Sequence, residues 1–179
     1  SISHKSSFSA MVTKYNNSGL VEWASIIAGT NKYNSSTENF ESVISTNDNG
    51  IIAAGNFNST KVTIPAEKTV NNTAITVTNS NELNNTSPLI VKYNSVGLVE
   101  WATKLGIMGN VSATEMISSN DEGFYLLVTM NGNGSISADQ TVNNATISLS
   151  YNSYMVFKCN KNGKVEYATK VSDLPAFNS

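Results

Sequence analysis

The chain has 179 residues, a formal net charge of −2, 11 lysines, no arginine, 13 acidic residues, one histidine and one cysteine. An arginine-free, mildly acidic chain lacks the basic patch that nucleic-acid binding requires, and no apolar run approaches the roughly 18 residues of a membrane span. The single Cys159 excludes an internal disulfide framework and a cysteine-rich zinc site. We therefore expect a single domain or repeat array with no nucleic-acid partner and no membrane insertion.

Three sequence modules recur along the chain in a fixed order. The first reads MVTKYNNSGLVEWA, LIVKYNSVGLVEWA and MVFKCNKNGKVEYA, at 11–24, 89–102 and 155–168. The second reads SVISTNDNGIIAAG and EMISSNDEGFYLLV, at 42–55 and 115–128, and the third reads TVNNTAITVT and TVNNATISLS, at 69–78 and 141–150. Self-similarity of this kind indicates a repeat architecture in which each copy is one supersecondary unit.

Each module predicts a strand, a turn and a second strand. The segments that flank the turns are rich in β-branched and aromatic residues, whereas the turns themselves read N-x-x-G or N-D-x-G. We expect the turn glycines to take positive φ, which glycine adopts at little steric cost; they are Gly19, Gly97, Gly163, Gly50 and Gly123. No stretch shows helical periodicity, so the prediction is an all-β, antiparallel fold.

The register of the first module follows from its charges. A lysine and a glutamate stand eight residues apart in each copy, as Lys14 and Glu22, Lys92 and Glu100, and Lys158 and Glu166. A three-residue loop would place each lysine opposite its glutamate, as a cross-strand ion pair on one face. The same register predicts a buried aromatic and aliphatic face, made of Tyr15, Val21, Thr13 and Trp23, then Tyr93, Val99, Val91 and Trp101, then Cys159, Val165, Phe157 and Tyr167.

The segments KYNSVGLVEWATKLG at 92–106 and MISSNDEGFYLLV at 116–128 carry a resemblance that extends to the other copies. They resemble the bacterial β-propeller repeats that run V-x-K-Y/D-x-x-G-x-x-x-W, followed by a strand that ends in D-x-G. The resemblance implies four-stranded antiparallel blades. It assigns the innermost strand to 42–48, the second to 51–57, the third to 89–93 and the outermost to 98–105. Each unit departs from the family pattern in a long insertion, at 61–78 and near 135–150, for which we expect an extra hairpin.

The resemblance divides the chain into an outer strand pair at 8–28, blade repeats at 38–106 and 112–171, and a tail at 172–179. That makes about two and a half blades, whereas closed propellers have about four or more. Three alternatives stay open. The chain is a fragment of a longer propeller, a subunit of a ring or fibre whose chains complete one another, or a β-sandwich or β-solenoid of the same repeats.

The residues that could carry chemistry are few, and each has a structural interpretation that we prefer. His4 precedes the repeats, and Cys159 occupies the position of Tyr15 and Tyr93, which predicts a packing thiol. Trp23, Trp101 and Tyr167 recur at one position and are expected in the core rather than on a carbohydrate platform. The Ser45–Gly50 segment and its equivalent at Ser118–Gly123 resemble a calcium loop weakly, because the bidentate glutamate is missing. Scattered carboxylates, expected to be solvated, are Glu38, Glu41, Glu67, Glu82, Asp139 and Asp173.

We therefore predict no catalytic set, no metal site and no cofactor. By family resemblance, ligands would contact the polar loops at 29–40, 106–114, 56–60 and 130–135, in which Tyr33 and Phe40 are the aromatic residues. The leading hypothesis is a non-enzymatic bacterial binding or scaffolding module, extracellular or on the cell surface, with a protein or glycan partner. The alternatives are a structural subunit that self-associates into a homo-oligomer and, as a minor one, a glycan-active enzyme domain.

Overall fold

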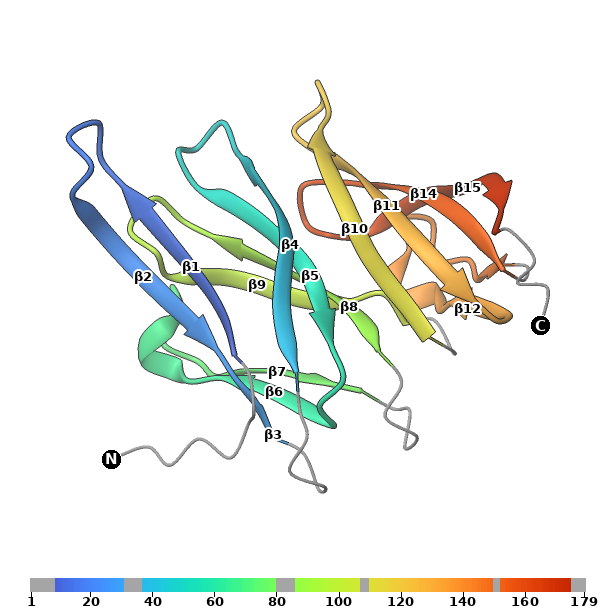
Figure 1. Cartoon of the computed structure of the whole chain (residues 1–179), viewed down its shortest axis with the longest axis horizontal. Coiled ribbons are helices and arrows are strands. Elements are labelled where there is room, and N and C mark those ends of the chain that lie inside the picture. Colours follow the sequence, from blue (N-terminus) through green and yellow to red (C-terminus); the bar gives the residue numbers. More distant parts are fainter. Residues whose placement is uncertain (1–8, 31–36, 80–85, 107–109, 150–151, 175–179) are drawn as a thin grey trace.

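The computed structural model describes residues 9–30, 37–79, 86–106, 110–149 and 152–174. Within these residues the regular elements are strands and two single turns of 3-10 helix, so the all-β, antiparallel prediction is confirmed. Figure 1 shows three layers side by side: a two-stranded hairpin and two four-stranded sheets.

The hairpin layer comes first in the chain. It consists of β1 (Ala10–Tyr15) and β2 (Val21–Ile27). The first four-stranded sheet has the order β4-β5-β8-β9, and its strands are β4 (Glu38–Ser45), β5 (Ile51–Phe57), β8 (Ser87–Tyr93) and β9 (Val99–Lys104). The second has the order β10-β11-β14-β15, and its strands are β10 (Asn110–Ser118), β11 (Phe124–Asn131), β14 (Ser153–Cys159) and β15 (Val165–Asp173). Both sheets follow the strand order that the repeats predict.

The insertion of each repeat forms a hairpin, as expected. In the first repeat β6 (Lys61–Ile64) pairs with β7 (Ile75–Thr78) and with the short β3 (Gly29–Thr30); in the second, β12 (Gly134–Ile136) pairs with β13 (Ile147–Leu149). The turns of 3-10 helix within them are η1 (Ala66–Lys68) and η2 (Ala138–Gln140). Each insertion then docks on the outermost strand of its own sheet, because Val70 N donates to Val99 O at 3.0 Å and Val142 N to Val165 O at 2.9 Å.

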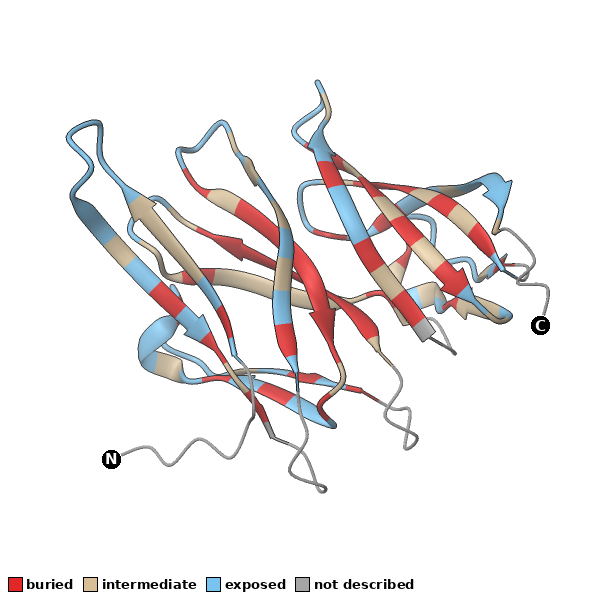
Figure 2. Cartoon of the chain, viewed as in Figure 1, coloured by how far each residue is buried: buried red, intermediate tan, exposed pale blue. Residues whose placement is uncertain are grey.

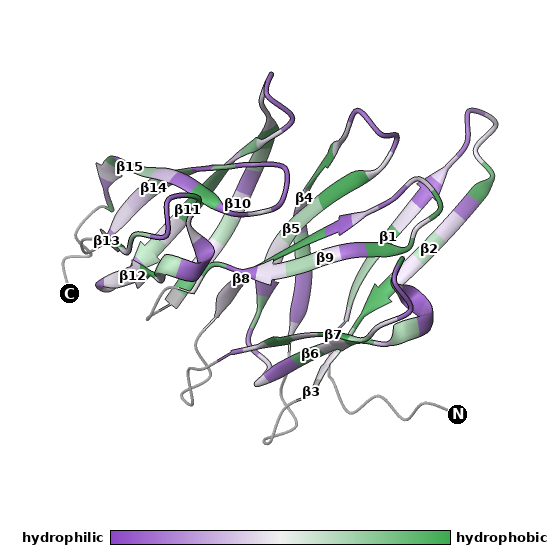
Figure 3. Cartoon of the chain, turned by 180° about the vertical axis from the view of Figure 1, so that it is seen from behind, coloured by the Kyte–Doolittle hydropathy of each residue, from purple (hydrophilic) through white to green (hydrophobic). Residues whose placement is uncertain are grey.

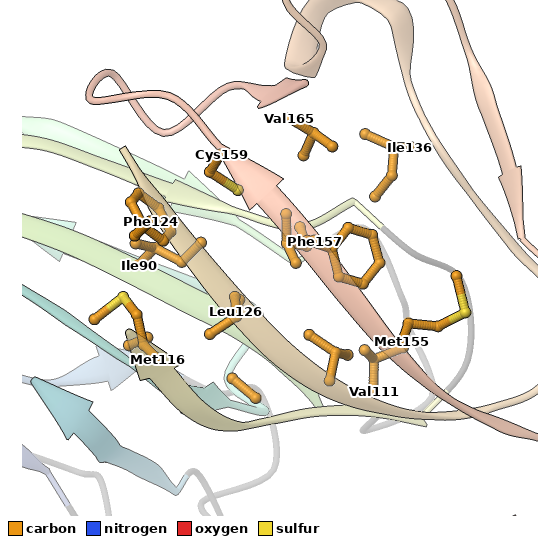
Figure 4. Close-up of a cluster of buried hydrophobic side chains, with 14 of the residues drawn as sticks. Ile90, Val111, Met116, Phe124, Leu126, Ile136, Met155, Phe157, Cys159 and Val165 are labelled. Atoms are coloured by element: carbon orange, nitrogen blue, oxygen red, sulfur yellow. The ribbon is translucent and has the colours of Figure 1, made fainter. Parts of the chain in front are cut away.

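Two hydrophobic clusters fill the spaces between the layers. One lies between the hairpin and the first sheet and includes Phe57, Leu89, Val91 and Tyr93, with Trp23 packed against it. The other joins the two sheets, and Figure 4 shows its side chains converging from both. Figure 2 shows the consequence: burial is concentrated in the central sheet, where all seven residues of β8 are buried.

Polar contacts also join the two sheets, from β4 and β5 of the first to β10 of the second. The side chain of Asn56 donates to Ala113 O at 3.1 Å and accepts from Ala113 N at 2.8 Å. The hydroxyl of Ser42 accepts from Met116 N at 3.1 Å. These bonds satisfy backbone groups of β10 near the point where the register of β10 against β11 shifts, between Ala113 and Glu115.

The predicted hairpin register is partly wrong. Tyr15, Tyr93 and Cys159 do pair with Val21, Val99 and Val165, but each lysine pairs with the aromatic residue after the glutamate, as Lys92 does with Trp101. The glutamate is the extra residue of a β-bulge, which turns the following side chain to the opposite face. Trp101 therefore points toward the second sheet rather than lying with Tyr93, and the ion pair of Lys14 with Glu22 still forms at 2.9 Å.

The turn glycines divide into two kinds. Gly19, Gly97 and Gly163 take positive φ as predicted, with values of 76°, 84° and 75°. Gly50 and Gly123 do not, because Asn49 and Glu122 carry the positive φ of those turns, at 60° and 66°. A Cβ at Gly50 would lie 2.3 Å from Tyr93 O and 2.4 Å from Lys92 Nζ, so glycine is required there chiefly by the close approach of the Tyr93 carbonyl of β8.

Candidate functional site

A buried lysine organises the turn end of the first sheet. Lys92 extends from β8 beneath the β4–β5 turn, and its side chain is only 6% exposed. Its Nζ donates to both carboxylate oxygens of Asp48 and to Thr46 Oγ1, each at 2.8 Å, and lies 3.8 Å from Glu100. Asp48 also accepts from Gly50 N at 3.0 Å, so one carboxylate holds both the turn and the lysine.

The second sheet repeats this arrangement. Lys158 is 4% exposed at its side chain, pairs with Asp121 at 2.8 Å and lies 3.5 Å from Glu166. Its ammonium also lies 5.6 Å from the centre of the Tyr125 ring, which faces the cation. The recurrence explains why K-Y-N and D-x-G modules recur together: the lysine of one module neutralises the aspartate of the other.

These ion pairs fix the protonation of the aspartates. The Lys92 ammonium, helped by the Thr46 hydroxyl, holds the pKa of Asp48 well below its ordinary value. Lys158 and then Ser119 do the same for Asp121. A carboxyl group held ionised in this way is a poor general acid.

The lowered pKa of Asp48 and Asp121 predicts a loss of stability in acid. A carboxyl group whose pKa is lower in the folded than in the unfolded state contributes stability above the unfolded pKa, near about 4, and loses it as the pH falls toward the folded pKa. We expect an Asp48→Asn, Asp121→Asn double variant to lose less unfolding free energy than the wild type between about pH 7 and about pH 2.5. Urea unfolding at a series of pH values measures this; identical acid dependence in both proteins would contradict the assignment.

A cleft with both polar and apolar walls opens between the two sheets at the same end. Its volume is about 350 Å³, and the turns of both sheets contribute to its walls. From the first sheet come Asn47, Asp48, Glu100 and Trp101, and from the second come Glu122, Gly123, Lys161 and Asn162. Figure 3, which views the molecule from behind, shows that the turns at this end are hydrophilic.

Trp101 forms the aromatic wall of this cleft. It is half-buried, packs against the cluster between the sheets and lies over the turn of the second sheet, where a Cβ on Gly163 would be 2.8 Å from its ring. The expectation that Trp101 is a core residue is therefore correct only in part. Tyr167, the equivalent residue of the second sheet, is 47% exposed, which contradicts the same expectation for that copy.

Hydrogen-bonding groups surround the indole. The side-chain amides of Asn47 and Asn162 have no hydrogen-bond partner among the described residues, whereas Lys161 pairs with Glu122 at 2.8 Å. Amides, a carboxylate and an aromatic ring in one cleft can bind a neutral ligand with both hydrogen-bonding groups and an apolar face. This cleft was not predicted from the sequence. The pattern that could have indicated it is the recurrence of the polar turn residues on either side of a tryptophan.

The loops predicted to bind ligands lie at the opposite end of the sheets. An open depression of about 690 Å³ brings three of them together through Thr37, Phe40, Asn56 and Ser112. Residues 130–135 do not line it, and Tyr33 lies outside the described residues. Glu38 borders it but is 2% exposed, so the expectation of a solvated carboxylate was wrong; burial raises its pKa, and it accepts from Gly29 N at 3.1 Å.

The remaining sequence candidates have structural roles or lie outside the described residues. Cys159 is buried as predicted, and burial raises the pKa of its thiol to about 12. The turns that resemble calcium loops are hairpin turns whose aspartates bind lysine. His4 and Glu82 are outside the described residues. In the described part of the chain no group of three or more metal-ligating side chains comes together.

Comparisons with known proteins add no family. No protein-family model matches the chain, and a search of curated proteins finds no similar sequence. Among the residues that the structure describes, no helix has the length and apolar character of a membrane span.

Proposed function

We propose that the chain is a non-enzymatic binding module, built from propeller-like blade repeats and acting outside the cell or on its surface. The blade interpretation is supported by two four-stranded antiparallel sheets of equal strand order that pack face to face. A composition rich in hydroxyl and amide side chains and low in charged residues favours an extracellular setting.

We propose a neutral glycan as the ligand and the cleft between the sheets as its site. The observation that carries this proposal is the position of Trp101, whose half-buried ring lines the same cleft as two amides, Asn47 and Asn162. A sugar ring offers an apolar face for the indole and hydroxyls for the amides. The absence of catalysis is part of the proposal, and the ion pairing of Asp48 with Lys92 supports it because that carboxylate is held ionised.

The fluorescence of Trp101 provides the test. The chain has two tryptophans, so a Trp23→Phe protein reports on Trp101 alone. We expect its emission to change on titration with a glycan selected from an array. In that background, Asn47→Ala with Asn162→Ala should weaken binding about tenfold or more, since each lost hydrogen bond costs about 0.5–1.5 kcal/mol.

The matched control is Ser18→Ala. Ser18 occupies the turn position of Asn162 but lies in the hairpin layer, away from the cleft, and should leave binding unchanged. Glycan binding that survives loss of both amides would exclude the cleft as the site. An array without any bound glycan would contradict the proposed ligand class.

A further inference from the structure

Equivalent residues join the hairpin to the first sheet and the first sheet to the second sheet. Trp23 of the hairpin lies over the β8–β9 turn, where a Cβ on Gly97 would be 2.6 Å from its ring. It also stacks on Tyr93 with 5.8 Å between ring centres, and its Nε1 donates to Ser95 O at 3.0 Å. Trp101 covers Gly163 of the next layer in the same way. At both contacts between layers, the tryptophan of one layer thus lies over the turn glycine of the layer that follows.

At each end of the stack formed by the three layers, one of the two partners of this contact is present without the other. At the start, Gly19 has the same positive φ as Gly97 and Gly163, but nothing lies within 4 Å of the position of its Cβ. At the finish, the equivalent of Trp101 is Tyr167, which is 47% exposed. One end therefore presents an uncovered glycine and the other an aromatic residue without a glycine beneath it.

The turn around Gly19 is already formed for such a contact. Asn16 Oδ1 accepts from Ser18 N and Leu20 N, both at 2.9 Å. Asn94 makes the equivalent bonds at 3.1 and 2.9 Å, and Asn160 makes them both at 3.0 Å. All three turns have one conformation, so an aromatic residue that fits Gly97 or Gly163 fits Gly19 without rearrangement.

The surfaces around these two positions are apolar where the internal layers are buried. We define the N-terminal face as Met11, Tyr15, Gly19, Val21 and Ile26, of which the four apolar side chains are 57–62% exposed. Three of their equivalents in the first sheet, Leu89, Tyr93 and Val99, are fully buried.

The opposite end of the stack shows the same contrast. We define the C-terminal face as Val156, Tyr167 and Val171 on β14 and β15, where Val171 is 61% exposed. Ile90 and Leu105, the equivalents of Val156 and Val171 in the first sheet, are buried against the second sheet. At both faces, therefore, positions that are buried in the internal layer are exposed, because no neighbouring layer covers them among the residues that the structure describes.

We propose that the C-terminal face of one copy of this chain docks on the N-terminal face of a second copy, with Tyr167 seated over Gly19. A second copy of the chain is the expected partner, because each exposed face is equivalent to a surface that the chain already buries between its own layers. The contact is head to tail, so repeated association generates a ring or a filament. It leaves the glycan cleft between the sheets unobstructed and goes beyond the function proposed above.

The test uses two variants that block opposite ends. Gly19→Asn keeps the positive φ, which asparagine tolerates, and fills the space that Tyr167 requires. Tyr167→Lys removes the aromatic group from the other end. Both positions are exposed in the single chain, so thermal unfolding at low concentration should match the wild type and establish that each variant is folded.

Sedimentation velocity over a wide concentration range gives the result. We expect the mass of the wild type to rise above the 19.2 kDa of one chain, and each variant alone to stay at one chain. An equal mixture of the two variants should form a complex of two chains that grows no further, because the two ends that remain are the ones blocked by the substitutions. Val142→Lys, an exposed apolar position on the second insertion, should associate like the wild type.

Three outcomes would overturn the proposal. They are a wild type that stays monomeric at every concentration, variants that associate as the wild type does, and a mixture that fails to form the two-chain complex. Association through any other pair of surfaces would also occur in each variant alone, because neither substitution changes those surfaces.

Discussion

Tyr93→Ala is expected to lower the free energy of unfolding by about 3–5 kcal/mol, as for other buried aromatic residues. Tyr15→Ala, measured in the monomeric protein, should change it by less than about 0.5 kcal/mol, the usual range for surface substitutions. The two tyrosines occupy the same position of the same K-Y-N motif, so the comparison isolates the environment from the residue type.

The difference arises from the neighbouring layer. Tyr93 has no exposed surface because the hairpin layer covers it and Trp23 stacks on its ring, whereas Tyr15 is 59% exposed. Alanine at residue 93 would leave a cavity between the hairpin and the first sheet, and alanine at residue 15 leaves none. Chemical denaturation of both variants below the association range decides the matter, and equal losses would mean that the hairpin does not pack on the first sheet as described.

Lys92→Ala is expected to cost about 3 kcal/mol, the lower end of the range for breaking a buried ion pair, because Asp48 stays partly hydrated after the lysine is removed. The side chain of Asp48 is 54% exposed, whereas that of Lys92 is 6% exposed. Lys14→Ala is the matched control and should cost about 0–1 kcal/mol, as for an exposed pair. Lys14 is 35% exposed and contacts Glu22 and Ser95 O, with no aspartate beside it.

A double-mutant cycle with Asp48→Ala separates the ion pair from the loss of the lysine stem. Lys92→Ala and Asp48→Ala should be non-additive, since the ion pair between the two residues is lost in either single variant, and only the bonds of Asp48 to the turn and of Lys92 to Thr46 add separately. Chemical denaturation of the four proteins gives the coupling energy. Additive losses would mean that the lysine stabilises the turn by packing alone.

The local structure was predictable because it depends on residues close together in the chain. Repeated hairpins with N-x-x-G turns gave correct strands, correct sheet orders and three correct positive-φ glycines. The bulge at Glu100 was not predictable from an eight-residue spacing, because an ion pair of lysine with glutamate is compatible with both registers. Its consequence was large, since it moved Trp101 to the face that lines the candidate cleft.

The candidate site required contacts between modules that the sequence presents separately. Asp48 and Lys92 are 44 residues apart, and the bond between them depends on β5 and β8 being neighbours in the sheet. Gly50 illustrates the same limit: a glycine beside an asparagine predicts a positive φ, but its actual role is to allow the close approach of β8, whose Tyr93 carbonyl would clash with a Cβ there. The role of Gly50 depends on pairing between segments that are distant in the sequence, and local conformational preferences do not predict such pairing.

The sequence by itself determined the repeat, the all-β class and the turn that each copy of the motif adopts, because hydrogen bonds and φ preferences within a few residues control these features. Only the tertiary structure decided which copy of a residue is buried. Tyr15 and Tyr93 share a motif, as do Trp101 and Tyr167 in their aligned positions, yet one of each pair is exposed. Burial depends on whether another layer lies against a strand, and the stack has a neighbour for its central sheet but not for its two ends.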